Sequence, residues 1–493
     1  MKKNVVKKVI AVFVMTAMMA AMAGCGNKAQ TNAGTDEGKK TEESNDVSSV
    51  EGDSASVEST EEDLGAYTIR TDANGNKIDL GGIEVVIRDW WSTGERTEAT
   101  DAWTDARYEY LDWIQETYNF TIKEMAISEW GAVPEDFANY VSTNGDDNYY
   151  VFALRTGDEL VAAMNSELMY DVSTLDCLDL SEDKWVHAIT DQYTKGDAVY
   201  GFRSYMGEML GGRGMYFNKT ILEQANIEPD KLYEWQESGE WTWEKFEEIC
   251  SQVEADTDND GVIDRFAMAA YNTVWYTMAV YSNFGDFIGK DEQGNYVNML
   301  ESSQTMEGMN WAFDMWRKYD ASKLYPEDAP WDYWNTMFTT GKACFCPAEL
   351  WRAGGFASAM EDDFGYVCFP KGPNATDYVN VCSDNPYAIP SCYDADKAWK
   401  IAFAYDLYTE PVPGFEDFET WKSGAYQNFR DTEAVELTVS RLMKNGRPAY
   451  DALIPGIKVA DDVIFAINEG NTPAQQAEAI RPVWAAYLEE ANK

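Results

Sequence analysis

Ile83-Glu-Val-Val-Ile-Arg88 is a short run of mostly β-branched residues, and it begins the folded part of the chain as a predicted strand. Helical patterns alternate after it with two further strand patterns, at residues 120–126 and 149–154. Strands that alternate with helices predict a parallel sheet with helices on both faces. Ligands of such sheets bind beyond the carboxyl ends of the strands, where we expect Trp90, Trp91, Arg155 and Thr156.

Beyond residue 200 the chain adds five short motifs to further strand and helix patterns. Thr242 is a suitable N-cap for a predicted helix over residues 243–254. In chain order the motifs are Tyr216-Phe-Asn-Lys219, Trp241-Thr-Trp-Glu244, the Asp-rich loop 256–264, Phe338-Thr-Thr-Gly-Lys-Ala343 and Phe369-Pro-Lys-Gly-Pro373. Together they resemble the successive signatures of the family 1 extracellular solute-binding proteins, the maltose-binding class, over about residues 83–490.

The resemblance implies an α/β fold of two lobes that are joined by hinge segments, with the ligand in the cleft between the lobes. It also implies a monomer that binds a solute by cleft closure and delivers it to an ABC permease, without catalysis. No catalytic residue is therefore assigned. We divide the chain into a signal peptide (1–24), a tether (25–63), the first lobe (64–205 and 351–408) and the second lobe (206–350 and 409–493).

The charge of the chain limits its partners. Its 493 residues include 86 acidic and 39 basic side chains, for a formal net charge of −47. Nucleic-acid binding relies on clustered Lys and Arg, so this balance excludes nucleic acid as an expected partner. The same charge would repel anionic lipid head groups, and membrane association then needs a hydrophobic or covalent anchor.

The N-terminus has the pattern of an export signal with a lipid anchor. A basic start over residues 1–8 precedes an apolar run from Val9 to Ala23, which is too short to span a membrane comfortably. Met22-Ala-Gly-Cys25 resembles the bacterial lipobox, with Met in place of the usual Leu, and this implies cleavage before Cys25 and its acylation. Residues 26–63 are polar and acidic, which predicts a flexible tether at the outer face of the membrane.

The other seven cysteines are an odd number, so they cannot all pair within one chain. Most of them lie beside apolar residues, as in Ala343-Cys-Phe-Cys346, which is typical of buried small hydrophobic residues. We predict reduced thiols.

An Asp-rich loop predicts a calcium site with structural function. Asp256, Asp258, Asp260 and Asp264 occupy positions 1, 3, 5 and 9 of a calcium-loop pattern, Gly261 occupies position 6, and Val262 supplies a carbonyl. Position 12 is Ala267, so the usual bidentate Glu is absent. The alternative is a solvated loop of Asx turns that holds no metal.

A saccharide site needs flat aromatic platforms with carboxylates, amides or guanidinium groups at their rims. The resemblance places a stacking tryptophan at Trp351, and Trp90 is the favoured partner from the first lobe. Our candidate ligand-binding residues are Trp90, Trp91, Arg155, Trp275, Glu349, Trp351, Arg352, Asp384 and Asn385. Four tryptophans are assigned to packing: Trp241, Trp243, Trp399 and Trp484.

Two other functions are compatible with the composition. A glycoside-cleaving enzyme would need two carboxylates about 5 to 10 Å apart, and no motif marks such a pair. A surface sensor or adhesin would share the anchor and the fold. Mechanisms based on histidine would depend on His187, the one histidine of the chain, whose neighbours predict a helix face.

Overall fold

The computed structural model describes residues 67–493, except positions 97, 100, 207–210, 383–384 and 417–418. The predicted signal peptide, Cys25, the tether and Asp384 lie outside these described residues. All described residues lie in one compact unit, 64–493, and the description below concerns that unit. Within them, no helix combines the length and apolar character that a membrane span requires.

The first lobe is built on a four-stranded sheet with the order β13-β3-β1-β2. β1 (Ile83–Asp89) is parallel to both of its neighbours, β2 (Phe120–Ala126) and β3 (Tyr149–Ala153). β13 (Tyr387–Ala388) pairs with β3 in the antiparallel direction. The predicted parallel strands are thus confirmed, and one antiparallel edge strand from a distant part of the sequence completes the sheet.

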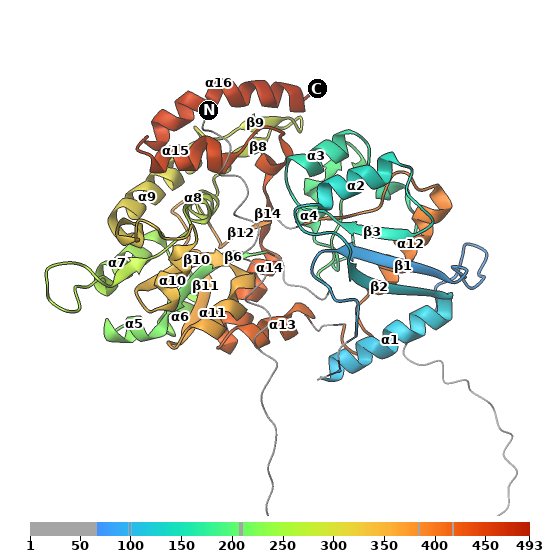
Figure 1. The fold of residues 1–493 in the computed structure, drawn as a ribbon, viewed down its shortest axis with the longest axis horizontal. Helices are drawn as coiled ribbons and strands as arrows, with labels where there is room; N and C mark the ends of the chain where they lie inside the picture. Colours follow the sequence, from blue (N-terminus) through green and yellow to red (C-terminus); the bar gives the residue numbers. More distant parts are fainter. Residues whose placement is uncertain (1–66, 97, 100, 207–210, 383–384, 417–418) are drawn as a thin grey trace, which may run out of the picture. The chain divides into compact units, whose positions relative to one another are not determined.

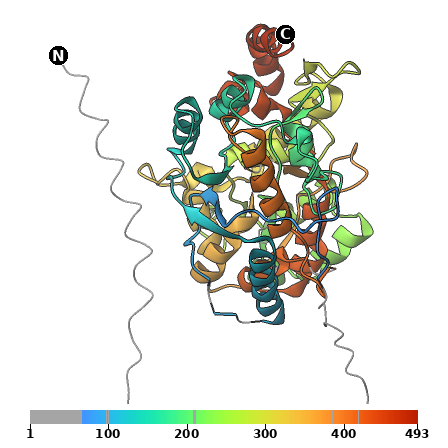
Figure 2. The same ribbon diagram turned by 90° about the vertical axis from the view of Figure 1, so that its right-hand side faces the viewer.

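Helices cover this sheet because the segments between its strands have capped, amphipathic sequences. α1 (Ala102–Tyr118) begins at Asp101, whose carboxylate accepts a hydrogen bond from the amide of Thr104, and it ends at Asn119 in the left-handed conformation. The other helices of this lobe are α2 (Val133–Ser142), α3 (Asp158–Asn165), α4 (His187–Gln192) and α12 (Ala395–Tyr408). α12, orange in Figure 2, packs on β2 and β3.

The second lobe is built on a four-stranded sheet with the order β11-β6-β10-β7. β6 (Arg213–Asn218) lies antiparallel between β10 (Ala343–Glu349) and β11 (Phe364–Cys368), and β7 (Phe266–Met268) is parallel to β10. Every residue of β10 before Glu349 is buried, as expected of a strand that is covered on both faces.

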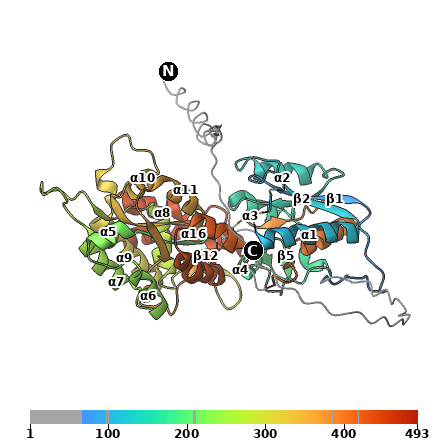
Figure 3. The same cartoon turned by 90° about the horizontal axis from the view of Figure 1, so that it is seen from below.

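Most helices of the described residues belong to this second lobe, and Figures 1 and 3 label them. Thr242 caps α7 through its hydroxyl, as predicted. The helices before the return to the first lobe are α5 (Lys219–Gln224), α6 (Lys231–Ser238), α7 (Trp243–Val253), α8 (Asn272–Tyr281), α9 (Ser303–Tyr319), α10 (Tyr333–Thr339) and α11 (Ala353–Ala359). The helices after it are α13 (Trp421–Asn428), α14 (Ser440–Lys444), α15 (Phe465–Asn468) and α16 (Pro473–Ala491).

Three two-stranded ladders complete the described strands. They are β4 (Thr194–Lys195) with β5 (Ala198–Val199), β8 (Ile288–Lys290) with β9 (Tyr296–Asn298), and β12 (Asn380–Cys382) with β14 (Gly446–Pro448). The last of these pairs two segments that the sequence separates widely, next to the point where the chain returns to the first lobe.

The return to the first lobe begins later than the sequence analysis placed it. Residues 351–408 were assigned to the first lobe, but β11 pairs with β6 along its whole length, from Phe364 opposite Asn218 to Cys368 opposite Gly214. The chain rejoins the first lobe only where Tyr387 pairs with Ala153. The return segment is therefore short: it consists of β13, α12 and the loops that flank them.

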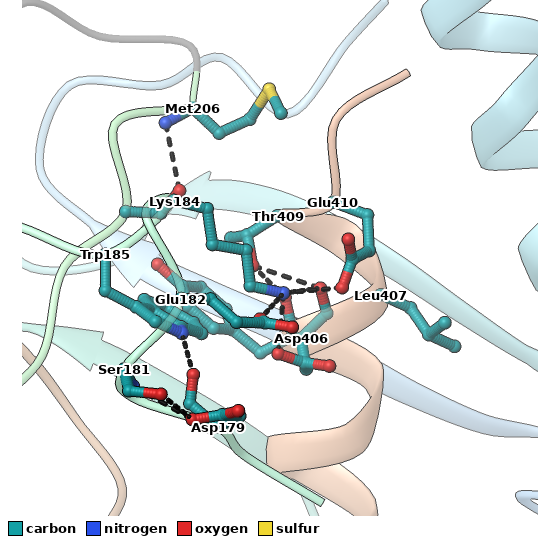
Figure 4. A network of polar contacts seen from close by, with 12 residues as sticks. Asp179, Ser181, Glu182, Lys184, Trp185, Met206, Asp406, Leu407, Thr409 and Glu410 are labelled. Carbon is teal, nitrogen blue, oxygen red and sulfur yellow. Dashed lines mark hydrogen bonds and ion pairs between the residues drawn. The ribbon is translucent and has the colours of Figure 1, made fainter. Parts of the chain in front are cut away.

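A buried ionic cluster fixes the end of α12, from which the chain leaves the first lobe again (Figure 4). The Lys184 ammonium lies 2.7 Å from Asp406 Oδ1 and 2.6 Å from Glu410 Oε1. The side chains of Lys184 and Asp406 are only 6% and 3% exposed. Arg70 pairs with the same two carboxylates, so the cluster also holds the first described residues of the chain against α12.

Candidate functional site

The carboxyl end of β10 presents an exposed indole beside an ion pair. β10 ends at Glu349 and passes through a short 3₁₀ turn, Leu350–Arg352, into α11. Arg352 donates from Nε to Glu349 Oε2 at 2.9 Å, and its guanidinium lies over the Trp351 ring, 4.2 Å from the centroid. The same guanidinium lies 4.5 Å from the centroid of the buried Trp334 ring. Trp351 is 64% exposed, so most of its surface is available to a ligand. We call Trp351, Arg352 and Glu349 the second-lobe triad.

The first lobe carries the same three groups. Arg155 follows β3, and its guanidinium lies 4.6 Å from the centroid of the Trp130 ring. Glu159, on the first turn of α3, lies 3.3 Å from Arg155. Trp130, in the loop after β2, is 56% exposed. We call Trp130, Arg155 and Glu159 the first-lobe triad.

The combination of these groups suits a saccharide. A guanidinium over an indole adds a cation–π attraction and leaves the rest of the ring as a flat apolar platform. The carboxylate beside it fixes the guanidinium and offers a second acceptor at the rim of the platform. A sugar ring has apolar C–H surface and hydroxyl groups at its edge, so one triad can contact both parts of the ring.

Contacts between the lobes lie beside the first-lobe triad. Asp158, next to the first-lobe triad, pairs with Lys458 of the second lobe at 3.6 Å. α3 also contacts the short turn Tyr450–Leu453, which holds Asp451. The positive charge of Arg213 acts on Asp451, and Arg213 lies opposite Glu349 in the register of β6 and β10. The contacts of α3 place the first-lobe triad beside the second lobe.

Trp90 and Trp91 lie where the sequence placed them, directly after β1. Their rings meet edge to face with centroids 4.7 Å apart. The Asp89 carboxylate accepts hydrogen bonds from the amides of Trp91 and Ser92 and so fixes this turn. Trp90 is half-buried against both cores, and Trp91 is 38% exposed. Trp91 is therefore the more accessible of the two.

The assignment of Trp275 to the ligand site is wrong. This residue lies in α8, which is buried on nearly every side, and its side chain is 0% exposed. Its indole N–H donates to the carbonyl of Ala312 at 2.9 Å, and its ring packs against Trp311. A helix that is apolar all round lies in the core, which is where α8 places Trp275. The predicted packing roles are confirmed for the four tryptophans assigned to them, Trp241, Trp243, Trp399 and Trp484.

Asn385 connects structural elements instead of presenting free groups. Its side-chain oxygen accepts from the amide of Thr156 at 3.2 Å, and its carbonyl accepts from Arg203 at 3.1 Å. Asn385 thus ties the loop after β3 to the segment that leads out of the first lobe. The neighbouring candidate, Asp384, lies outside the described residues.

The Asp-rich loop brings three of its four aspartates together. One carboxylate oxygen each from Asp256, Asp258 and Asp260 lies within 4.8 Å of the others. Backbone amides fill part of this space, since the Asp256 carboxylate accepts from the amides of Asp260 and Gly261. Asp264 instead accepts from the amide and hydroxyl of Thr257, which removes it from the group.

Two described cavities lie away from the triads. One of about 490 Å³ is lined by both lobes, including Lys184, His187 and Trp421. The other, of about 450 Å³, lies in the first lobe beside Arg107 and Glu124. His187 begins α4 and is exposed, in agreement with the predicted helical position.

The described cysteines are unpaired in the structure, and Cys250, Cys344, Cys346 and Cys368 are buried. Burial raises the pKa of the Cys344 thiol, so it stays protonated at neutral pH. These residues act as small apolar side chains of the core.

Sequence reasoning missed Trp130 and Trp331. Trp130 belongs to the first-lobe triad, and Trp331 is 71% exposed beside the Tyr271 ring, with centroids 5.6 Å apart. The sequence indicates a loop position for Trp130, because this residue follows a predicted strand and precedes Gly131. It does not indicate the exposure of the two tryptophans, because exposure depends on which distant segments cover them.

The fold has two α/β lobes, and each lobe carries one triad. Residues 168–405 match the family model described as bacterial extracellular solute-binding protein. The resemblance to family 1 extracellular solute-binding proteins is therefore confirmed over this stretch.

A curated protein is similar to about half of this chain. An arabinooligosaccharide-binding protein of Halalkalibacterium halodurans is 24% identical over 263 residues, which are 47% of this chain and 53% of that protein. The alignment thus spans about half the length of that curated relative.

Solved structures share the fold over most of the chain. The cyclic α-maltosyl-1,6-maltose binding protein of Arthrobacter globiformis has a TM-score of 0.58 at 15% identity, covering 83% of this chain and 100% of that one. UgpB of Mycobacterium tuberculosis, in complex with glycerophosphocholine, has a TM-score of 0.54 at 15% identity, covering 82% and 98%. At such identities the likeness establishes the fold alone.

Proposed function

We propose that this protein is the substrate receptor of an ABC importer and that it binds a mono- or oligosaccharide between its lobes. The observation that carries the proposal is the pair of triads, one on each lobe, each with an exposed indole, an arginine and a carboxylate. A ligand that contacts both triads holds the lobes together, which is how cleft closure couples to binding.

The names of similar proteins support a saccharide as the ligand. The curated relative is named for arabino-oligosaccharides, and solved structures with this fold include a cyclo/maltodextrin-binding protein with maltotetraose and a chitin oligosaccharide binding protein. These proteins are named for binding, and we propose that the present chain likewise binds its solute without turnover.

We further propose that the chain is held at the outer face of the membrane by lipid on Cys25, where it meets its permease as a monomer. The basic start, the apolar run and Met22-Ala-Gly-Cys25 support the anchor. Replacement of Cys25 by Ala should release the protein from the membrane fraction and change its mobility. Membrane retention with unchanged mobility would contradict the anchor.

We also propose a weak, structural calcium site in the Asp-rich loop. Its support is the group formed by Asp256, Asp258 and Asp260 together with the sequence spacing, in which Asp264 and the Val262 carbonyl complete the pattern. A cation would have to draw Asp264 away from Thr257, or recruit water in its place.

The test of the main proposal is incubation of the purified protein with a panel of oligosaccharides. A receptor leaves the saccharide unchanged and shows a higher melting temperature, since ligand at 100 times its Kd adds about 2.7 kcal/mol to the free energy of unfolding. Release of shortened products would instead show a hydrolase and would overturn the proposal. A panel without any shift would exclude saccharides as the ligand class.

A further inference from the structure

Arg213 is the first residue of β6 and lies at the same edge of the sheet as the second-lobe triad. It is the register partner of Glu349, the last residue of β10. Its backbone amide donates to Asn380 Oδ1 at 3.1 Å, which fixes the start of the strand. The Arg213 guanidinium therefore lies beside the carboxylate that holds Arg352 over Trp351.

The guanidinium of Arg213 has unused hydrogen-bonding capacity. Its Nε is buried and has no hydrogen-bond partner among the described residues. Glu349 Oε1 lies 4.0 Å from it, beyond hydrogen-bond distance, and the other oxygen of Glu349 already accepts from Arg352 at 2.9 Å. A buried guanidinium N–H without an acceptor reduces the stability of the folded protein. A ligand that supplies an acceptor removes this penalty, and the free energy recovered adds to its affinity.

Four other cations of the two lobes lie closer to a carboxylate than Arg213 does. The pairs are Arg352 with Glu349 at 2.9 Å, Arg447 with Asp286 at 2.7 Å, Lys458 with Asp158 at 3.6 Å and Arg155 with Glu159 at 3.3 Å. Arg213 has none within hydrogen-bond distance in the described part of the chain. Arg213 shares the Glu349 carboxylate with Arg352 and lies at the longer of the two distances, so its guanidinium can accept a further carboxylate from a ligand.

Asp451 has a hydrogen-bond partner of its own. It accepts a hydrogen bond from the Tyr281 hydroxyl at 3.2 Å. Burial raises the pKa of Asp451, while the Tyr281 hydrogen bond and the Arg213 charge oppose that rise only in part.

We propose that the saccharide carries a carboxylate, as a uronic acid residue does, and that Arg213 binds this carboxylate while Trp351 contacts the sugar ring. The inference rests on the proposed function, since it names the class of saccharide for the same site. A guanidinium is planar and binds a carboxylate through two parallel N–H donors, which a neutral hydroxymethyl group cannot match. Arg155, whose Nε is also buried without a partner among the described residues, offers a second donor from the first lobe.

The experiment compares digalacturonate with its carboxyl-reduced product, which has the same rings and linkage but no charge. Calorimetric titration of the full protein should show at least tenfold tighter binding of the acidic sugar, as charge-assisted hydrogen bonds imply. Glucuronic acid against glucose, and glucuronosyl-xylotriose against xylotriose, extend the test to other rings. Each acidic member that binds should lose affinity as salt is added.

Variants then assign the carboxylate to Arg213. Arg213→Gln should remove most of the preference for the acidic member and leave the affinity for the reduced sugar within about threefold. The control is Arg481→Gln, which makes the same change of charge at an exposed position of α16 paired with Glu301, and it should alter neither affinity. If Arg213→Gln does not fold, Arg155→Gln tests the second donor, with a smaller loss of the same preference as the expected result.

The outcomes separate this inference from the proposed function. Binding of neutral saccharides as tight as that of their acidic partners would overturn the inference and leave the receptor function standing. Tighter binding of glucose 6-phosphate than of glucuronic acid would show a phosphate site and also overturn it. Failure of every saccharide in the panel to bind would overturn both.

Discussion

The guanidinium of Arg352 lies 4.2 Å from the centroid of the Trp351 indole, and the same group donates to Glu349 and lies 4.5 Å from the centroid of the buried Trp334 ring. Trp334 supports this arrangement from within the core, because it is almost wholly buried. The exposed indole is thus attached to a rigid element instead of a free loop. Preorganisation of this kind reduces the entropy that a ligand must remove when it binds.

Replacement of Trp351 by Ala should weaken saccharide binding by about 2 kcal/mol or more, as truncation of a central aromatic contact does. The free energy of unfolding without ligand should change little, because the side chain is mostly exposed. Calorimetric titration and urea unfolding of the same preparation measure the two quantities. Tyr487→Ala, an exposed aromatic residue on α16, is the control and should leave both unchanged. An unaltered Kd for Trp351→Ala, or loss of the fold, would defeat the stacking role.

Replacement of Trp275 by Ala should have the opposite effect. Its side chain fills the core between α8 and α9 and donates to the Ala312 carbonyl, so removal leaves a cavity and an unpaired acceptor. The expected loss is about 3 to 5 kcal/mol of the free energy of unfolding, measured in urea. A variant with wild-type stability and weaker saccharide binding would return Trp275 to the ligand site.

The contrast between these two tryptophans shows how far the sequence leads. Both follow predicted strands, and the sequence places both at the ligand edge of a sheet. What separates them is a tertiary fact: α9 covers α8, while no described element covers Trp351. The two-lobed α/β fold was predictable because strand and helix periodicities and five ordered motifs are local signals. Trp130 escaped because its partner Arg155 comes from another strand.

The segment through which the chain returns to the first lobe also shows that local sequence patterns do not predict long-range contacts. A stretch such as Phe364–Cys368 is a clear strand by its composition, but composition does not say which sheet it joins. Its antiparallel pairing with β6 is a long-range contact that local sequence patterns do not reveal, so its predicted place in the first lobe is wrong.

Removal of calcium by a chelator should lower the melting temperature if the Asp-rich loop binds the ion. Three carboxylates within 4.8 Å repel one another without a cation, and metal bound only to the folded state adds stability. Asp258→Asn combined with Asp260→Asn should abolish the response to chelator. An equal response in this double variant would place the metal elsewhere, and no response in the wild type would exclude a calcium site here.

Replacement of Lys184 by Met should destabilise the protein by about 3 kcal/mol, because it leaves Asp406 buried with Arg70 as its remaining cation. Burial lowers the pKa of Lys184, but Asp406 and Glu410 raise it by more, so the ammonium is charged at neutral pH. Lys400→Met is the control, because Lys400 lies on α12, the helix that carries Asp406. Its pair with Asp396 is exposed and should contribute less than about 1 kcal/mol. If urea unfolding shows the same loss of unfolding free energy in both variants, the buried cluster contributes no more to stability than the exposed pair does.

Asp320 should make the protein less stable as the pH rises from about 4 to 7. Its carboxyl is buried beside β7, where it accepts from the amides of Ser322 and Ala270. Burial raises its pKa to about 7, and the hydrogen bonds from Ser322 and Ala270 oppose the rise only in part. In the unfolded chain the pKa of an aspartate is about 3.9. Because the folded state holds the proton more tightly, the stabilisation from this group is complete below pH 4 and is lost as the pH passes through 7.

The measurement is the free energy of unfolding in urea at several values between pH 4 and 8, for the wild type and for Asp320→Asn. The amide keeps an oxygen for the Ser322 amide but does not titrate, so the variant should lose less stability than the wild type over this range. Asp286, whose pKa burial raises to about 6 against the opposing charge of Arg447, titrates in the same range in both proteins, and the difference between the two curves removes its contribution. Parallel curves would show that Asp320 is ionised in the folded protein throughout this range and that its burial is fully compensated by its hydrogen bonds.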